Sequence, residues 1–271
     1  MTDMVCAGID AGSRAIKVAL VAAAGRGMLG SGIADQGVEQ RESAEALFAR
    51  VLMESSLTRD DVAAVVATGY ARNAVGVADV TITEVTCHAR GVYEQRPDAA
   101  TVIEIGGQDS KILHLDGMGG VRDFAMNDRC AAGTGRFLEM VAERLGVGLG
   151  RFGEMAGRSS RPATISNVCA VFAETEIIGL LAAGAQPEEV AAGVEAAIAS
   201  RVATLARGAF APPVVLTGGV ALVPGMSAAL AQAIGQPVCV ADDPQMTGAV
   251  GAAILACQHV RGGAPRRICG C

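Results

Sequence analysis

The sequence predicts an α/β protein of two lobes, each built on a mixed β-sheet flanked by helices. Three observations lead to this fold class. Short apolar, β-branched runs alternate with segments of helical periodicity along the chain. A strand, a tight glycine turn and a second strand occur at residues 4–21 and again at 101–115. A third strand ends in a Gly-Gly turn at 214–219. Such alternation is typical of α/β folds.

The first lobe begins with the hairpin over residues 4–21, which has an apolar run on each side of its turn. Periodicity then predicts a helix over 43–53 and a strand over 62–68. No low-complexity linker divides the chain, so the repeated patterns place the lobes at 1–97 and 98–245.

The second lobe opens with the hairpin over 101–115. A helix over 133–145 follows, with Gly146 as its C-terminal cap. Helical apolar spacing returns after Cys169, with Ser166 as N-cap, and ends at Gly184.

The last segments are a strand at 214–217, a helix at 225–234, an extended stretch at 237–241 and a helix at 247–258. A C-terminal helical segment, 246–260, is expected to pack back on the first lobe, and 261–271 to form a flexible tail.

Composition restricts the possible functions. The 271 residues are 51% hydrophobic, yet no run of about 18 apolar residues occurs. The apolar start lacks the basic segment and cleavage site of a signal peptide. We therefore expect a soluble, cytoplasmic protein with no membrane partner. A net charge of -6 argues against nucleic acid as a partner, because phosphate neutralisation needs clustered cations.

Eight cysteines in such a chain favour reduced thiols or metal ligands over a disulfide framework. Two stand out, Cys130 in NDRCAAGTGRF (127–137) and Cys169 in SNVCAVFAETE (166–176). Each lies at or just before a predicted helix N-terminus, where free N–H groups favour a thiolate and an anionic cluster. A cubane iron–sulfur cluster needs four thiolates, so two chains related by a two-fold axis would complete it. Burial as a small apolar side chain and a four-thiolate zinc site are the alternatives.

The other cysteines have weaker patterns. Cys6, Cys239 and Cys257 lie in apolar runs, which favours core packing, and the Cys87-His88 pair is expected to be structural. A Cys-Gly-Cys sequence, 269–271, follows the predicted tail, and the sequence does not establish its role.

The two hairpins repeat one pattern of residues. DAGSRAIK (10–17) aligns with EIGGQDSK (104–111), so that a carboxylate, a glycine and a lysine fall at the same offsets. Glycine lets backbone N–H groups approach an anion, and a carboxylate at a strand end can hold Mg²⁺. Neither a Walker motif nor a complete G-x-G-x-x-G is present, which argues against P-loop and Rossmann folds.

These loops, together with LTGG (216–219), resemble the phosphate-1, phosphate-2 and adenosine motifs shared by actin, sugar kinases and heat-shock chaperone ATPases. The resemblance implies two ribonuclease-H-like lobes with ATP in the cleft between them. Within that superfamily, the segment IEIGGQDSK (103–111) and both cysteine segments resemble the activator ATPases of 2-hydroxyacyl-CoA dehydratases and benzoyl-CoA reductases. TGY (68–70) and TEVTCHA (83–89) add to this resemblance, which extends from residue 8 to residue 258.

The resemblance implies a role for each matching residue. Asp10 would hold Mg²⁺ with help from Asp109, and Glu104 or Gln108 would orient the attacking water. Arg14 departs from the usual Thr of the wider superfamily, and Glu104 replaces the usual Asp. The nucleotide would be bound by Gly12, Ser13, Arg14, Ala15, Lys17, Gly106, Gly107 and Gln108 at the phosphates, and by Gly218, Gly219 and Gln245 at the adenosine.

The implied protein is an oxygen-sensitive ATPase that uses ATP/ADP, Mg²⁺ and one [4Fe-4S] cluster per dimer. It would be a homodimer, or a heterodimer with a homologous subunit. It would take electrons from ferredoxin or flavodoxin and pass them to a CoA-ester dehydratase or reductase. Two other functions use the same motifs without a cluster: a small-molecule (sugar or acyl-group) kinase, and a regulatory ATP-binding module.

Overall fold

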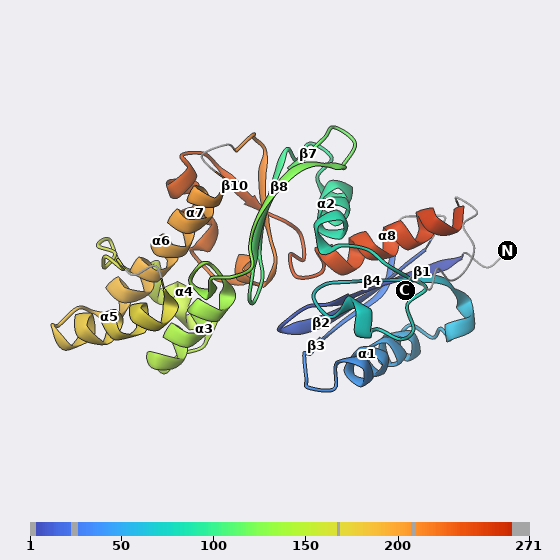
Figure 1. Cartoon of the computed structure of the whole chain (residues 1–271), viewed down its shortest axis with the longest axis horizontal. Helices are drawn as coiled ribbons and strands as arrows, with labels where there is room; N and C mark the ends of the chain where they lie inside the picture. Colours follow the sequence, from blue (N-terminus) through green and yellow to red (C-terminus); the bar gives the residue numbers. More distant parts are fainter. Residues whose placement is uncertain (1–3, 23–26, 167–168, 207–209, 262–271) are drawn as a thin grey trace. The chain divides into compact units, whose positions relative to one another are not determined.

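The computed structural model describes residues 4–22, 27–166, 169–206 and 210–261. The chain forms two compact units, drawn in Figure 1. Unit 1 contains the described residues within 1–97, 117–121 and 245–271, and unit 2 those within 98–116 and 122–244.

Unit 1 is built on a five-stranded mixed sheet in the order β3-β2-β1-β4-β5. β1 pairs antiparallel with β2 and parallel with β4, so the first hairpin lies at the centre of the sheet. β2 and β3 pair antiparallel, whereas β4 and β5 pair parallel. The strands are β1 (Val5–Ala11), β2 (Ala15–Ala22), β3 (Met28–Asp35), β4 (Val62–Thr68) and β5 (Val80–Thr81).

Helices bury both faces of this sheet. Side chains of α1 (Gln40–Glu54) share a hydrophobic cluster with alternate residues of β1, such as Ile9. The β1 side chains that point to the other face, such as Cys6, cluster with α8 (Thr247–Arg261) and with Cys87 of α2 (Glu84–Gln95). Strand side chains point alternately to the two faces, so Asp10, on the parity of Cys6, faces the α2 and α8 side. Two 3₁₀ turns, η1 (Arg59–Asp61) and η2 (Arg72–Ala74), flank β4.

Glycines bring β1, α2 and α8 into close backbone contact. A Cβ at Gly8 would overlap the backbone of α8, and one at Gly251 would overlap the Cys87 carbonyl of α2. α2 and α8 therefore lie side by side on the sheet (Figure 1).

Unit 2 repeats this sheet arrangement in the order β10-β9-β6-β7-β8. β6 pairs antiparallel with β7 and parallel with β9, and β9 pairs parallel with β10. The second predicted hairpin is therefore also central in its sheet. The strands are β6 (Thr101–Ile105), β7 (Ser110–Leu115), β8 (Val121–Asn127), β9 (Val214–Thr217) and β10 (Val238–Val240).

The helices of unit 2 share one hydrophobic core with the sheet, and α6 contributes more buried side chains to it than any other described helix of the unit. The helical elements are η3 (Ala131–Gly133), α3 (Gly135–Arg144), α4 (Leu149–Ala156), α5 (Ala170–Ala182), α6 (Pro187–Leu205), η4 (Gly219–Leu222) and α7 (Met226–Ile234).

The mixed α/β fold is as predicted, and Gly146 takes the left-handed conformation expected of a helix end. Two local predictions were wrong. The N-cap of α5 is Cys169, not Ser166, because Ser166 donates instead to the Glu176 carboxylate at 2.6 Å. Cys239 is exposed rather than in the core, because it lies on β10 at the sheet edge. Most of the predicted tail, including residues 269–271, lies outside the described residues.

Within the described ranges, no helix combines the length and the apolar character needed to cross a bilayer.

Candidate functional site

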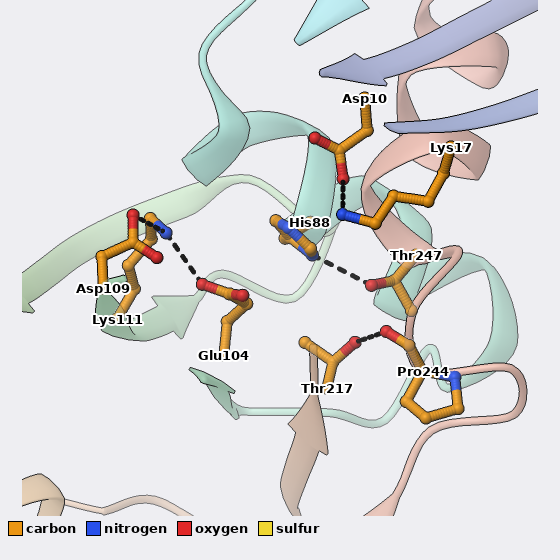
Figure 2. A network of polar contacts seen from close by, with 9 residues as sticks. All are labelled: Asp10, Lys17, His88, Glu104, Asp109, Lys111, Thr217, Pro244 and Thr247. Carbon is orange, nitrogen blue, oxygen red and sulfur yellow. Dashed lines mark hydrogen bonds and ion pairs between the residues drawn. The ribbon is translucent and has the colours of Figure 1, made fainter. Parts of the chain in front are cut away.

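The hairpin of unit 1 ends in a buried carboxylate paired with a lysine. Asp10, at the end of β1, is 3% exposed, and its Oδ2 lies 3.1 Å from Lys17 Nζ on β2. The two residues are register partners in the sheet. The turn between them is closed by Gly12 N–H, which donates to the Ala15 carbonyl at 3.1 Å. Figure 2 shows the pair.

Three glycines pack closely against this carboxylate–lysine pair. A Cβ at Gly12 would lie 3.1 Å from Lys17 Nζ, and one at Gly248 would lie 3.0 Å from Asp10 Oδ2. A Cβ at Gly69 would overlap Asp10 Oδ1, and Gly69 has φ +88°. Glycine is favoured at that φ because a side chain would be strained. A side chain at Gly69 or Gly248 would therefore crowd the oxygens of Asp10, of which Oδ2 also contacts Lys17 Nζ.

Unit 2 repeats this arrangement one hairpin later. Lys111, 1% exposed, places Nζ 2.8 Å from Glu104 Oε2 and 2.8 Å from Asp109 Oδ2 (Figure 2). Glu104 and Lys111 are register partners, as Asp10 and Lys17 are. Gly106 N–H closes the turn by donating to the Asp109 carbonyl at 3.0 Å, which matches the bond made by Gly12.

The repeat includes a threonine and a glycine on the neighbouring parallel strand. Thr68 is the register partner of Asp10, and Thr217 is that of Glu104. Each threonine is followed by a glycine of positive φ, Gly69 or Gly218. A Cβ at Gly218 would lie 2.8 Å from Glu104 Oε1. Gly69 was not predicted to lie beside Asp10. The sequence does contain a signal for it, because a Thr-Gly pair occurs both at 68–69 and at 217–218.

In unit 2, Gly218 is hydrogen-bonded to the segment that follows β10. Gly218 N–H donates to the Pro244 carbonyl at 2.9 Å, and Thr217 Oγ1 donates to the same oxygen at 2.8 Å. Gln245 comes next in the chain and is half-buried, as is Gly219.

His88 is a second residue that sequence reasoning did not place here. It is 6% exposed on α2, and its Nδ1 lies 2.9 Å from Thr247 Oγ1 (Figure 2). A Cβ at Gly248 would lie 3.1 Å from His88 Nε2. His88 and the Asp10 carboxylate therefore both lie close to Gly248. Burial raises the pKa of the neighbouring Cys87 thiol to about 12, which agrees with the structural role expected of it.

The other predicted phosphate residues lie on the two turns. Ser13 is half-buried and Arg14 is exposed, with NH1 3.8 Å from Asp35 Oδ1. Gly107 is half-buried and Gln108 exposed on the second turn. The structure thus places the predicted phosphate residues at the ends of the two hairpins, one in each unit, whereas Gly218 and Gly219 follow β9 in unit 2 and Gln245 belongs to unit 1.

Both candidate cluster cysteines precede helical turns of unit 2. Cys169 is exposed and is the N-cap of α5. Cys130 is half-buried and precedes the 3₁₀ turn η3, and the α-helix itself begins at Gly135. Within the described residues, no group of three or more His, Cys, Asp or Glu side chains could hold a metal ion.

The Cys130 segment is bonded to the second hairpin turn. Gly135 N–H donates to the Gly106 carbonyl at 2.9 Å, and Arg136 N–H donates to the Gly107 carbonyl at 2.8 Å. A Cβ at Gly135 would lie 3.1 Å from that Gly106 oxygen. The first N–H groups of α3, which have no partner within a helix, are thus satisfied by the turn.

These two carboxylate–lysine hairpins with a Thr-Gly neighbour define a duplicated α/β ATPase architecture. The chain belongs to the BadF/BadG/BcrA/BcrD ATPase family, whose model matches residues 7–256. It is 42% identical over 250 residues to the activator of lactoyl-CoA dehydratase of Anaerotignum propionicum, an alignment that covers 92% of this chain and 96% of that protein.

Two solved structures extend the comparison. The activator of the 2-hydroxyisocaproyl-CoA dehydratase from Clostridium difficile, with bound ADPNP, superposes with a TM-score of 0.90 at 38% identity and covers 96% of this chain and 97% of its own. The ROK hexokinase of Thermus thermophilus has a TM-score of 0.51 at 18% identity, covering 96% of this chain and all of its own. This second likeness shows the shared sugar-kinase-type fold alone.

Proposed function

We propose that this protein is an ATP-hydrolysing iron–sulfur activator. It would pass low-potential electrons from ferredoxin or flavodoxin to a 2-hydroxyacyl-CoA dehydratase or a benzoyl-CoA reductase-type enzyme. Two kinds of support exist: the relatives that are named activators of such dehydratases, and the arrangement of the residues themselves.

Nucleotide binding is supported by the glycines of both hairpin turns, which place no side chain at the end of either hairpin. Backbone N–H groups can approach a phosphate where no Cβ intervenes, and a relative of the same family was solved with ADPNP. Phosphate contacts are assigned to Gly12, Ser13, Arg14, Ala15, Lys17, Gly106, Gly107 and Gln108, and adenosine contacts to Gly218, Gly219 and Gln245.

The carboxylates fit a magnesium ion and a hydrolytic water. Mg²⁺ prefers oxygen ligands and keeps several of its waters, and Asp10 provides two carboxylate oxygens at the end of a strand, beside the glycines at 12, 69 and 248. Asp10 would hold the ion with the help of Asp109, and the ion would neutralise phosphate charge. Glu104 or Gln108 would orient the attacking water.

The donor set of Cys130 and Cys169 fits half of an iron–sulfur cluster. Each is the N-cap residue of a helical turn, where N–H groups stabilise negative charge. Two thiolates per chain become four when two copies meet, which is the number that a [4Fe-4S] cluster requires. When bound, the cluster would supply one-electron transfer.

A second copy is supported by the exposed apolar side chains of α5. Val171, Phe172 and Ile178 are 67%, 64% and 45% exposed, and all three lie on the helix that begins at Cys169. Apolar surface of this kind marks an interaction site. We assign it to the homodimer contact, or to a contact with a homologous subunit, because it adjoins the cysteine that a partner would have to approach.

One observation carries the proposal. The N-terminal N–H groups of α3 donate to the Gly106 and Gly107 carbonyls, so two backbone hydrogen bonds connect the Cys130 segment to the second hairpin turn, residues 106–109, which we call the phosphate-2 turn. A turn that shifts when the γ-phosphate leaves would therefore shift the segment that carries Cys130. Differential binding of ATP and ADP to two arrangements is what can drive such a change.

The test is iron and sulfide analysis of anoxically purified protein. We expect about four irons per dimer in the wild type and loss of iron in Cys130→Ala and in Cys169→Ala. Cys239→Ala is the matched control, because Cys239 is an exposed thiol elsewhere in unit 2, and it should keep its iron. A wild-type protein free of iron that phosphorylates a sugar or an acyl group would refute the proposal and favour the kinase.

A further inference from the structure

One side chain holds both main-chain polar groups of Cys130. Asn127, the last residue of β8, accepts a hydrogen bond from Cys130 N–H on its Oδ1, at 3.1 Å. Its Nδ2 donates to the Cys130 carbonyl oxygen at 2.8 Å. The cysteine backbone is therefore bound on both sides by a residue that belongs to the sheet of unit 2.

These two bonds restrict the direction of the thiol. They fix the orientation of the peptide groups on either side of the Cys130 Cα, where φ is −123° and ψ is 111°. The Cα–Cβ vector follows from φ and ψ, so rotation about χ1 is the main freedom left to the Sγ atom. A metal ligand held in this way has little conformational freedom to lose when it binds.

The loop that follows closes over the same amide. A Cβ at Gly133 would lie 3.3 Å from Asn127 Nδ2, so a larger residue would crowd the amide. Thr134 Oγ1 donates to the Ala131 carbonyl at 2.7 Å and tightens the turn. Beyond it, the Gly135 N–H reaches the phosphate-2 turn. The segment from 127 to 136 is thus bonded to the sheet at its start and to the phosphate-2 turn at its end.

The chemistry of the clamp requires an amide. It needs one acceptor and one donor on a planar group, which Asn provides. An ionised aspartate of the same size would accept from Cys130 N–H but would have no donor for the carbonyl.

We propose that Asn127 is a positioning residue for Cys130 as a cluster ligand. It holds the thiolate in the orientation that the cluster needs. A shift of the phosphate-2 turn would then move Cys130 as part of a hydrogen-bonded segment instead of being absorbed by a flexible loop. This inference rests on the proposed function, and it adds a residue outside the ligand set. Removal of an outer-shell partner typically costs about 10- to 100-fold in metal affinity.

The experiment uses the full-length protein, purified without oxygen, with Asn127→Ala, Asn127→Asp and the control Asn73→Ala. Asn73 is an exposed asparagine of unit 1. Iron loss to a ferrous chelator is followed by absorbance with ADP and with ATP bound, and the reduced cluster is examined by EPR. The urea midpoint of the iron-free protein is measured for each variant, so that loss of fold is recognised.

We expect about tenfold faster iron loss in Asn127→Ala, an altered EPR spectrum and an unchanged urea midpoint. Asn127→Asp, which keeps one bond, should lie between the wild type and Asn127→Ala. Asn73→Ala should match the wild type. If Asn127→Ala unfolds, the Asp variant decides the question.

The inference would be overturned if both Asn127 variants had the iron-loss rate and the EPR spectrum of the wild type. It would also be overturned if iron were lost faster only in variants whose urea midpoint is lowered. Each of these results would leave the proposed function standing, because the wild type would still hold its cluster. A wild type without iron would overturn the proposed function and this inference together.

Discussion

Glu195 on α6 is a buried acid whose replacement by glutamine should change the pH dependence of stability. Its side chain is 4% exposed and faces the Gly225 turn at the start of α7, where a Cβ would lie 2.6 Å from Oε2. Oε1 has no hydrogen-bond partner among the described residues. Burial raises the pKa of this carboxyl from 4.5 to about 8. Gln has the size of the neutral acid and does not ionise.

The raised pKa sets both the sign and the size of the effect. Between pH 4.5 and about 8 the folded state keeps the Glu195 proton while the unfolded state releases it. The free energy of unfolding therefore falls as pH rises through this interval, and is constant with respect to this group on either side of it. At about 1.4 kcal/mol per pH unit, the full change is at most about 5 kcal/mol.

The assay is urea unfolding of the wild type and Glu195→Gln at pH 5 and pH 8. The difference in unfolding free energy between the two proteins should shift in favour of the variant by several kcal/mol at the higher pH, up to the limit of about 5 kcal/mol. Glu143→Gln, at an exposed position on α3, is the control and should follow the wild type. Parallel pH profiles for the wild type and Glu195→Gln would show that Glu195 is not held neutral by the fold.

Three further substitutions follow from the same structure. Lys111→Met should lower the unfolding free energy by about 3–5 kcal/mol, measured by urea unfolding, because Glu104 would be left buried without its cation. Gly69→Ala should cost about 1–3 kcal/mol for its positive φ and should weaken ADP binding measured by calorimetry. Phe172→Ser should raise the dimer dissociation constant at least about tenfold in analytical ultracentrifugation, because two exposed rings would leave the contact.

Matched controls separate these effects from general damage. Arg41→Met removes an exposed ion pair with Glu45 and should change stability by less than about 1 kcal/mol. Gly117→Ala adds a methyl group where no atom lies within 4 Å. Met118→Ser alters a side chain that is 79% exposed in the other unit and should leave the dimer intact. A test variant that behaves like its control contradicts the corresponding prediction.

The hairpins could be predicted because each consists of two apolar runs around a glycine turn, a local pattern. The edge strands β3 and β8 were missed, since half-exposed strands at a sheet edge lack a continuous apolar run. The 19-residue helix α6 was missed because alanine and other small residues occur on all of its faces. Its sequence therefore shows no clear helical period of apolar residues.

The aligned repeat predicted that Glu104 and Lys111 take the same places in the second hairpin as Asp10 and Lys17 in the first, and the strand registers show this. The two bonds between α3 and the phosphate-2 turn could not be predicted, because they join backbone groups 29 positions apart that any residue could supply. The apolar spacing after Cys169 did predict a helix, but α5 leaves Phe172 and Ile178 exposed and buries Ala173 and Ile177 instead.

The packing of α8 against β1 has a consequence for biosynthesis. Unit 1 joins the first strand of the chain to its last described helix, and Gly8 and Gly251 admit that helix to backbone contact. Until translation has passed residue 261, the sheet face that carries Cys6 lacks α8 and can be covered only by α2. Unit 2 is nearly continuous in sequence, so it can become compact during synthesis before unit 1 is complete. The unit that carries the two candidate iron ligands can therefore fold before the unit that contains the N-terminal strands.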